Sequence, residues 1–175
     1  LLIENGQITR VLSAAEVSPG LNVDREIDLD GMWLVPGLID LRCALREPGD
    51  EHKETIATGL AAAAAGGFTA VCTTPDTQPV ADNAALIHLL KQKASKAAAA
   101  RLLPVGAATR GLSEDGLAPM GELADAGCVA VSQGEWPISD AQLMRRALEY
   151  ASIFELPVFS AACERSLDGL CNEGP

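Results

Sequence analysis

Residues 34–41 (LVPGLIDL), 51–65 (EHKETIATGLAAAAA) and 68–74 (FTAVCTT) decide the fold of this chain. The first and third stretches are apolar runs with the length of buried strands, and the second is an alanine-rich stretch typical of a helix. Gly66 and Gly67 separate that helix from the second run, as expected at a helix end. A strand, a helix and another strand in this order indicate a βαβ unit, in which the two strands are parallel.

The same alternation continues along the chain. Helices are expected at residues 82–100, 117–126 and 140–154, with Ser139 as the N-cap of the last, and strands at residues 101–108, 128–132 and 157–162. A closed barrel of β/α repeats needs eight strands and about 250 residues, so the five repeats predicted here form only part of one. An open doubly wound sheet is the alternative, although neither G-x-G-x-x-G nor a P-loop follows any strand.

The start of the chain has a different pattern, which predicts a small β domain over residues 1–33 ahead of the barrel part at residues 34–175. Asn5-Gly6 is a favoured hairpin turn between two short strands. The strand-like stretches are residues 1–3, 7–12 and 25–29.

The charge of the chain excludes some classes of partner. Acidic residues outnumber basic ones by 24 to 13, which gives a net charge of −11. A nucleic acid or an anionic membrane surface would be repelled, so a small molecule or another protein is expected. No apolar run approaches the roughly 20 residues that span a bilayer, and no secretory signal pattern opens the sequence, so we expect a cytoplasmic protein.

Metal-binding side chains are scarce. The five cysteines are scattered without a C-x-x-C pair, which is typical of reduced, buried thiols. His52 and His88 are the only histidines in the sequence. His52 is expected on the surface and His88 on a helix, so a site rich in imidazole is not expected.

One stretch carries a family resemblance. Residues 36–49 read PGLIDLRCALREPG and resemble the dihydroorotase branch of the amidohydrolase superfamily, whose members read P-G-x-I-D-x-H-x-H-x-R-E-P-G here. Residues 74–79 (TPDTQP) are similar to the M-P-N-T-x-P of that family, and residues 144–151 to its fifth-repeat helix. The resemblance implies a TIM-type (β/α)8 barrel of the amidohydrolase type, of which this chain carries the first five β/α repeats, with a small N-terminal β domain.

The resemblance also implies a metal site that has lost its ligands. In the family, the two histidines of H-x-H lie on one side of a strand and hold divalent metal, commonly zinc, that activates water for attack on a cyclic amide. The four corresponding vestigial metal-ligand positions are Arg42, Ala44, Gln133 and Ala162. A guanidinium has no lone pair to offer and alanine has no donor atom. No catalytic residue, no metal ligand and no bound zinc are therefore expected.

The vestigial substrate-binding positions implied by the resemblance are Arg46 and Asp76. Arg46 matches the family arginine that pairs with the substrate carboxylate, but its companion asparagine is Asp76 here, whose charge repels such a substrate. We therefore expect Arg46 to pair with Asp76 or Glu47. Arg42 is expected beside Asp40, because both share the inward parity of the first barrel strand.

Three functions follow as hypotheses. Dihydroorotase-like proteins without metal ligands associate with the catalytic chain of aspartate carbamoyltransferase in pyrimidine biosynthesis, and the resemblance implies such a structural subunit in an oligomer. An active metal-dependent dihydroorotase, recruiting metal through other residues or a partner chain, is the second. A pocket that senses a metabolite without turnover is the third.

Overall fold

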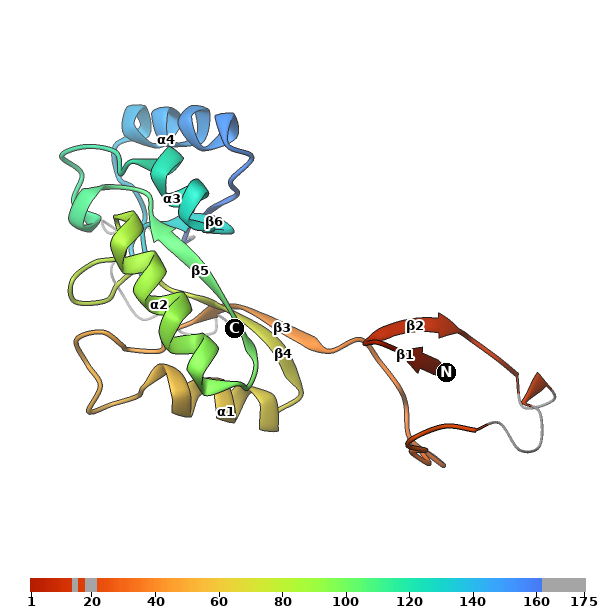
Figure 1. The fold of residues 1–175 in the computed structure, drawn as a ribbon. Coiled ribbons are helices and arrows are strands. Elements are labelled where there is room, and N and C mark those ends of the chain that lie inside the picture. The colour runs from red at the N-terminus through yellow and green to blue at the C-terminus, as the bar shows by residue number, and fades with distance from the viewer. Residues whose placement is uncertain (14–15, 18–21, 162–175) are drawn as a thin grey trace, which may run out of the picture. The chain divides into compact units, whose positions relative to one another are not determined.

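The computed structural model describes residues 1–13, 16–17 and 22–161 of the chain (Figure 1). The chain divides into two compact units, Leu1–Pro36 and Gly37–Pro175.

The first unit contains a hairpin. Strand β1 (Leu2–Glu4) pairs antiparallel with β2 (Gln7–Arg10). The turn residues Asn5 and Gly6 have φ angles of 51° and 74°, the left-handed conformation that a two-residue hairpin turn requires. The predicted strand at residues 25–29 is wrong, because these residues are not in a strand. Alternating side chains make a strand only where a neighbouring backbone accepts the hydrogen bonds.

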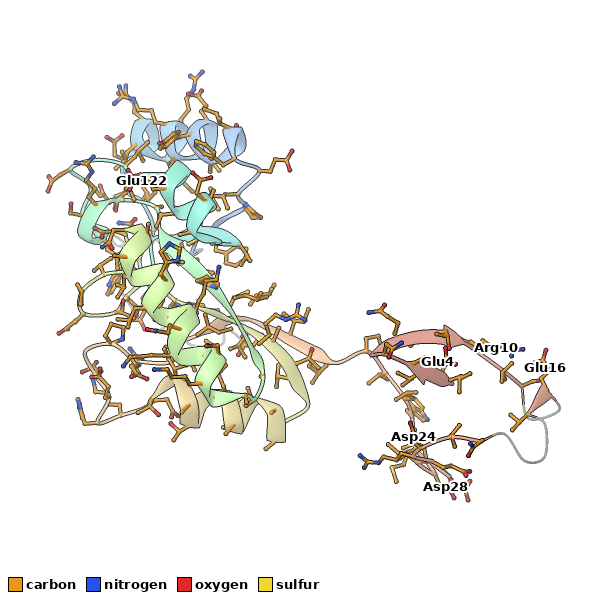
Figure 2. The ribbon with its side chains drawn as sticks, in the orientation of Figure 1. Glu4, Arg10, Glu16, Asp24, Asp28 and Glu122 are labelled. Atoms are coloured by element: carbon orange, nitrogen blue, oxygen red, sulfur yellow. The ribbon has the colours of Figure 1, made fainter. Side chains whose placement is uncertain are left out.

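The surface of the first unit is acidic. Figure 2 labels five of its charged side chains, and all of them are exposed: Glu4, Arg10, Glu16, Asp24 and Asp28. Four of these five are carboxylates, in keeping with the acidic charge of the whole chain. The described part of this unit therefore carries no basic surface of the kind that binds nucleic acid.

The second unit is a curled parallel sheet of five strands in the order β3-β4-β5-β6-β7. The strands are β3 (Leu38–Cys43), β4 (Phe68–Thr73), β5 (Arg101–Ala107), β6 (Ala130–Ser132) and β7 (Val158–Phe159). Their spatial order equals their chain order, as in a barrel of β/α repeats. A doubly wound sheet would instead reverse direction at a switch point, so the open-sheet alternative is wrong.

Four helices connect these strands and form the outer layer (Figure 1). They are α1 (Ile56–Ala65), α2 (Ala84–Ala97), α3 (Met120–Ala126) and α4 (Ala141–Ile153), with a short 3-10 turn, η2 (Arg110–Leu112), after β5. Helix α1 packs on β4 and α2, and α2 packs on β5 and α3. None of the helices in the described ranges is long and apolar enough to cross a membrane.

Several element boundaries differ from those predicted, and those of β3 and α4 bear on the site and on helix capping. Strand β3 begins at Leu38 rather than at residue 34, because Pro36 has no N–H to donate to a ladder. It also continues to Cys43, so Arg42 lies inside the strand. The N-cap of α4 is Asp140 rather than Ser139, since the Asp140 carboxylate accepts the N–H of Gln142 at 2.7 Å.

The core lies between the helices and the sheet. Its largest fully buried side chains come from both layers and include Ile56, Leu60, Val71, Ile87, Leu90, Met120, Leu123 and Val131, while Val105 belongs to a second, smaller cluster with Cys72 and Ala130. Gly106 permits close packing of α3 on β5, because a Cβ at this position would lie 2.8 Å from Leu123 Cδ1. This layer holds the strands so that their carboxyl ends meet at one edge.

Candidate functional site

A cavity of about 370 Å³ lies at the carboxyl ends of the strands, and we call it the strand-end cavity. Each of the five strands contributes to its wall, and the lining residues are Leu41, Arg42, Thr73, Thr74, Val105, Ser132, Gly134, Val158, Phe159, Ser160 and Ala161. This is the edge at which parallel β/α folds carry their ligand and catalytic sites. The cavity is therefore the candidate functional site.

Arg42 is the one charged residue among the lining residues in the described ranges. Its backbone N–H donates to Asp40 Oδ1 at 2.8 Å. The expected pairing of the Arg42 charge with Asp40 is not found, because among the described residues the guanidinium forms no ion pair and only the backbone N–H of Arg42 contacts Asp40. A permanent cation is exposed in the wall of the strand-end cavity.

Gln133 lies beside the cavity without lining it. Its side chain is held on both ends, because Oε1 accepts from Thr109 Oγ1 at 2.8 Å and Nε2 donates to the Leu112 carbonyl at 2.9 Å. The residue is 6% exposed. Its neighbours Ser132 and Gly134 line the cavity instead.

Ala44 and Ala162 are the other two expected ligand positions. Ala44 is half-buried and is not among the described lining residues. Ala162 lies outside the described residues.

Thr73 is a lining residue that sequence reasoning missed. It is 4% exposed, and its Oγ1 has no hydrogen-bond partner among the described residues. A buried hydroxyl without a partner costs about 1–3 kcal/mol, which makes the atom a candidate ligand contact. The available signal was its place at the end of an apolar run, where β4 reaches the cavity.

Arg46 and Asp76 form the predicted ion pair, with Nη1 3.9 Å from Oδ2. The other carboxylate oxygen of Asp76, Oδ1, is buried without a hydrogen-bond partner among the described residues. Neither residue is among those found lining the strand-end cavity. The two vestigial substrate positions therefore contact each other.

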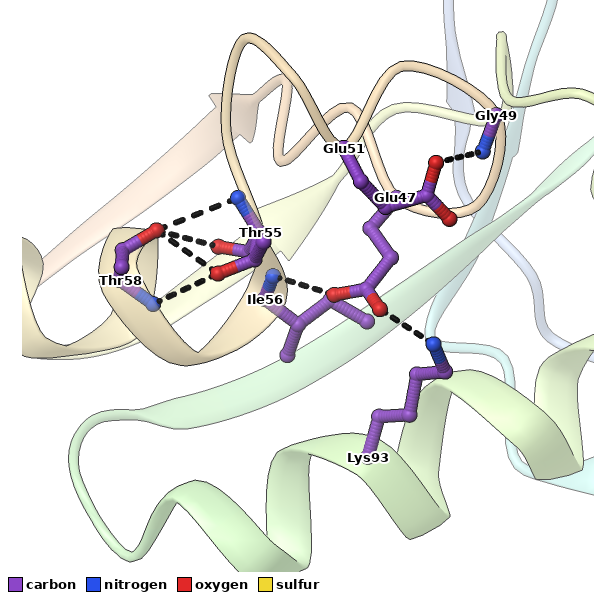
Figure 3. Close-up of polar contacts among 7 residues, drawn as sticks. All are labelled: Glu47, Gly49, Glu51, Thr55, Ile56, Thr58 and Lys93. Carbon is purple, nitrogen blue, oxygen red and sulfur yellow. Dashed lines mark hydrogen bonds and ion pairs between the residues drawn. The ribbon is translucent and has the colours of Figure 1, made fainter.

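Glu47, the other expected partner of Arg46, makes different contacts (Figure 3). Its Oε2 accepts the N–H of Ile56 at 2.7 Å, and its Oε1 accepts from Lys93 Nζ on α2. Burial raises the pKa of Glu47, but the Lys93 hydrogen bond, the Ile56 N–H and the Lys93 charge together lower it below its ordinary value. Glu47 thus joins the loop after β3 to the first residue of α1 and to α2.

The remaining metal-binding side chains do not gather at the cavity. His52 and His88 are both exposed, on the loop before α1 and on α2. Burial raises the pKa of the Cys43, Cys72 and Cys128 thiols, that of Cys128 to about 12, which keeps them protonated at neutral pH.

The described side chains do not fit a zinc site. Across residues 1–13, 16–17 and 22–161 no three His, Cys, Asp or Glu side chains are placed to hold a metal ion. A catalytic zinc needs three such ligands. The guanidinium of Arg42 in the cavity wall would also repel a divalent cation.

Comparison with known proteins places the chain in a family. A family model described as dihydro-orotase-like matches residues 31–174. The chain belongs to the dihydroorotase-like family. Proteins named dihydroorotase from Desulforapulum autotrophicum and Syntrophobacter fumaroxidans are 49% identical over 178 residues and 52% identical over 151 residues. These matches cover 99% and 85% of this dihydroorotase-like chain, but only 41% and 34% of those relatives.

The fold of this dihydroorotase-like chain is also found in a solved structure. The L-hydantoinase (dihydropyrimidinase) of Arthrobacter aurescens superposes with a TM-score of 0.64 and is 18% identical, covering 83% of this chain and 32% of that protein. At this identity the likeness concerns the fold alone. It confirms the predicted partial barrel of the amidohydrolase type with a small separate N-terminal sheet.

Proposed function

We propose that this chain is a non-catalytic member of the dihydroorotase-like family and that it acts as a structural subunit of aspartate carbamoyltransferase in pyrimidine biosynthesis. One observation carries the proposal: Arg42, a permanent cation, lines the strand-end cavity where the family resemblance places a metal ligand. Two further positions support the same interpretation. The Gln133 side chain is hydrogen-bonded to Thr109 and Leu112, and the Ala44 side chain has no atom that could coordinate a metal.

The scaffold supports a role for the protein surface. The buried core, the Glu47 contacts and the capping box of α1 are formed, whereas Arg42 in the cavity wall differs from the metal ligand that the family resemblance implies there. A partner that binds only the folded form stabilises it, by roughly 2.7 kcal/mol at a hundredfold excess over Kd. The choice of the aspartate carbamoyltransferase catalytic chain as partner rests on the resemblance to metal-free dihydroorotase-like proteins.

An active dihydroorotase is the second candidate. The relatives named dihydroorotase, at 44–52% identity, favour it. The chain spans less than half of their length, so ligands from elsewhere in the full-length protein belong to this candidate.

Metal content and turnover distinguish the two candidates. The full-length protein is purified, analysed for metals and assayed for dihydroorotate hydrolysis with added zinc, beside the Desulforapulum autotrophicum relative as the assay control. We expect no stoichiometric metal and no turnover. About one metal per chain, together with hydrolysis that a chelator abolishes, would falsify the non-catalytic role.

Partner binding is tested by co-expression with the aspartate carbamoyltransferase catalytic chain of the same organism, followed by size-exclusion chromatography with light scattering. We expect the two proteins to elute together at micromolar concentration. The Arg42→Ala variant should assemble equally well, because the cavity is not the proposed contact surface. Separate elution, with transcarbamoylase size and activity unchanged by omitting this protein, would exclude the subunit role.

A further inference from the structure

We infer that the strand-end cavity binds a small organic carboxylate through Arg42, without turning it over. The inference goes beyond the subunit role and rests only on the non-catalytic half of the proposed function. The site differs from the Arg46 position, because Arg46 pairs with Asp76 and is not among the described residues that line the cavity.

Charge is the first argument. Arg42 is the only charged lining residue in the described part of the chain, and no carboxylate is found in the wall. Asp40 is the nearest acidic residue on the strand, yet its Oδ1 receives the backbone N–H of Arg42 rather than the guanidinium. The planar guanidinium retains a fork of N–H donors that matches the geometry of a carboxylate.

The hydroxyl groups are the second argument. Thr73 Oγ1 is buried in the wall without a partner among the described residues. Ser132 Oγ accepts the N–H of Gly134 at 3.1 Å, so its own proton remains to be donated. Thr74 adds one further hydroxyl, whereas the Ser160 hydroxyl donates to the Ala161 carbonyl at 3.4 Å. The wall is rich in donors, and a ligand that accepts hydrogen bonds satisfies them.

Size and the apolar part of the wall narrow the ligand class. About 370 Å³ falls within the range of small-molecule sites. Val105, Val158 and Phe159 supply an apolar part of the wall. Inorganic phosphate has no apolar body to bury there, whereas a carboxylate on a small ring or branched chain does.

Benzoate is the probe, with benzamide as its neutral counterpart and inorganic phosphate as the oxyanion control. Each is titrated by calorimetry into the full-length protein, in a buffer free of carboxylates and phosphate. We expect saturable binding of benzoate, at least about tenfold weaker binding of benzamide, and no saturable binding of phosphate.

Three variants test whether Arg42 and Thr73 contact the bound benzoate. Arg42→Gln should weaken benzoate binding at least about tenfold, Arg42→Lys should weaken it less because the charge remains, and the near-isosteric Thr73→Val should also weaken it. Arg145→Gln is the matched control, because Arg145 is exposed on α4 and pairs with Glu149. Thermal unfolding checks that each variant is folded.

Several results would overturn the inference: no saturable benzoate binding, equal affinity for benzamide, tighter binding of phosphate, or unchanged affinity after both Arg42→Gln and Thr73→Val. A different experimental result would contradict the proposed non-catalytic function. Benzoate binding that depends on a bound metal, is lost with a chelator and survives Arg42→Gln would contradict the non-catalytic role as well. Loss of partner binding alone leaves the carboxylate site intact.

Discussion

Glu47 is the residue on which the loop after β3 depends. Its carboxylate, on a residue only 9% exposed, receives the N–H of Ile56 and the ammonium of Lys93 (Figure 3). The contact fixes the loop that also carries Arg46. A buried carboxylate in this position is therefore structural, although it lies within the motif that carries the family resemblance.

Replacing Glu47 by Gln should lower the free energy of unfolding by about 1–3 kcal/mol, because the charged hydrogen bond from partly exposed Lys93 is lost. Urea unfolding of the purified protein measures the change. Glu149→Gln is the control, since Glu149 forms an exposed pair with Arg145 and its loss should cost less than about 1 kcal/mol. Equal losses for the two variants would contradict a special role for Glu47.

The stabilisation by Glu47 should also depend on pH. The folded-state pKa of Glu47 lies below its ordinary value of 4.5, so its contribution is present above that value and disappears as pH falls through the folded-state pKa. The Lys93 pKa is raised, mainly by its hydrogen bond with Glu47, so the pair stays charged at neutral pH. The stability difference between wild type and Glu47→Gln should therefore shrink between about pH 5 and pH 3. A constant difference would show that the charge is irrelevant.

Among the elements, α1 shows how side chains define a helix start. Thr55 Oγ1 accepts the N–H of Thr58, and the Thr58 hydroxyl accepts the N–H of Thr55, which forms a capping box. The helix therefore begins at Ile56 rather than at residue 51. The residues before it form the loop that Glu47 anchors.

Thr55→Ala should destabilise the protein by about 1 kcal/mol, because the N–H of Thr58 loses its acceptor at the helix start. Denaturant unfolding gives the value. Ser95→Ala is a matched control on α2, where the exposed hydroxyl only donates to the carbonyl of Gln92, and should change stability by less than about 0.5 kcal/mol. If Thr55→Ala is no more harmful than Ser95→Ala, the cap does not define the helix start.

On the scale of the whole molecule, the second unit is a sheet with β3 and β7 at its ends. Strand β3 carries exposed apolar side chains, namely Leu38, Ile39 and Leu41. An exposed apolar edge strand tends to pair with other chains unless further structure covers it.

A polypeptide of residues 1–175 should therefore self-associate in solution, and Ile39→Lys should reduce this, because a charge on an edge strand opposes pairing. Sedimentation velocity at several concentrations measures the effect. Ile153→Lys is the control, since Ile153 is 70% exposed at the end of α4, away from the sheet. A monomeric wild-type polypeptide, or equal effects of the two variants, would contradict this role of β3.

The sequence by itself determined the order of the elements and one residue of the site, Arg42. Apolar runs alternating with amphipathic or alanine-rich stretches are local patterns, so they predicted the β/α repeats within a few residues of their observed ends. Asn5-Gly6 predicted its hairpin turn because the backbone preference is local too. Motif spacing placed Arg42 and Arg46 near the carboxyl end of the first barrel strand, and β3 carries Arg42 there.

The tertiary structure alone decided which polar groups satisfy one another. Glu47 contacts Lys93 across 46 positions, and Gln133 turns to Thr109 and Leu112 rather than lining the cavity. Such pairings depend on which buried donors and acceptors meet once the strands and helices pack, and sequence spacing does not encode this. The unpartnered hydroxyl of Thr73 is the same kind of result, because a strand-end threonine becomes a candidate ligand contact only when folding buries it without an acceptor.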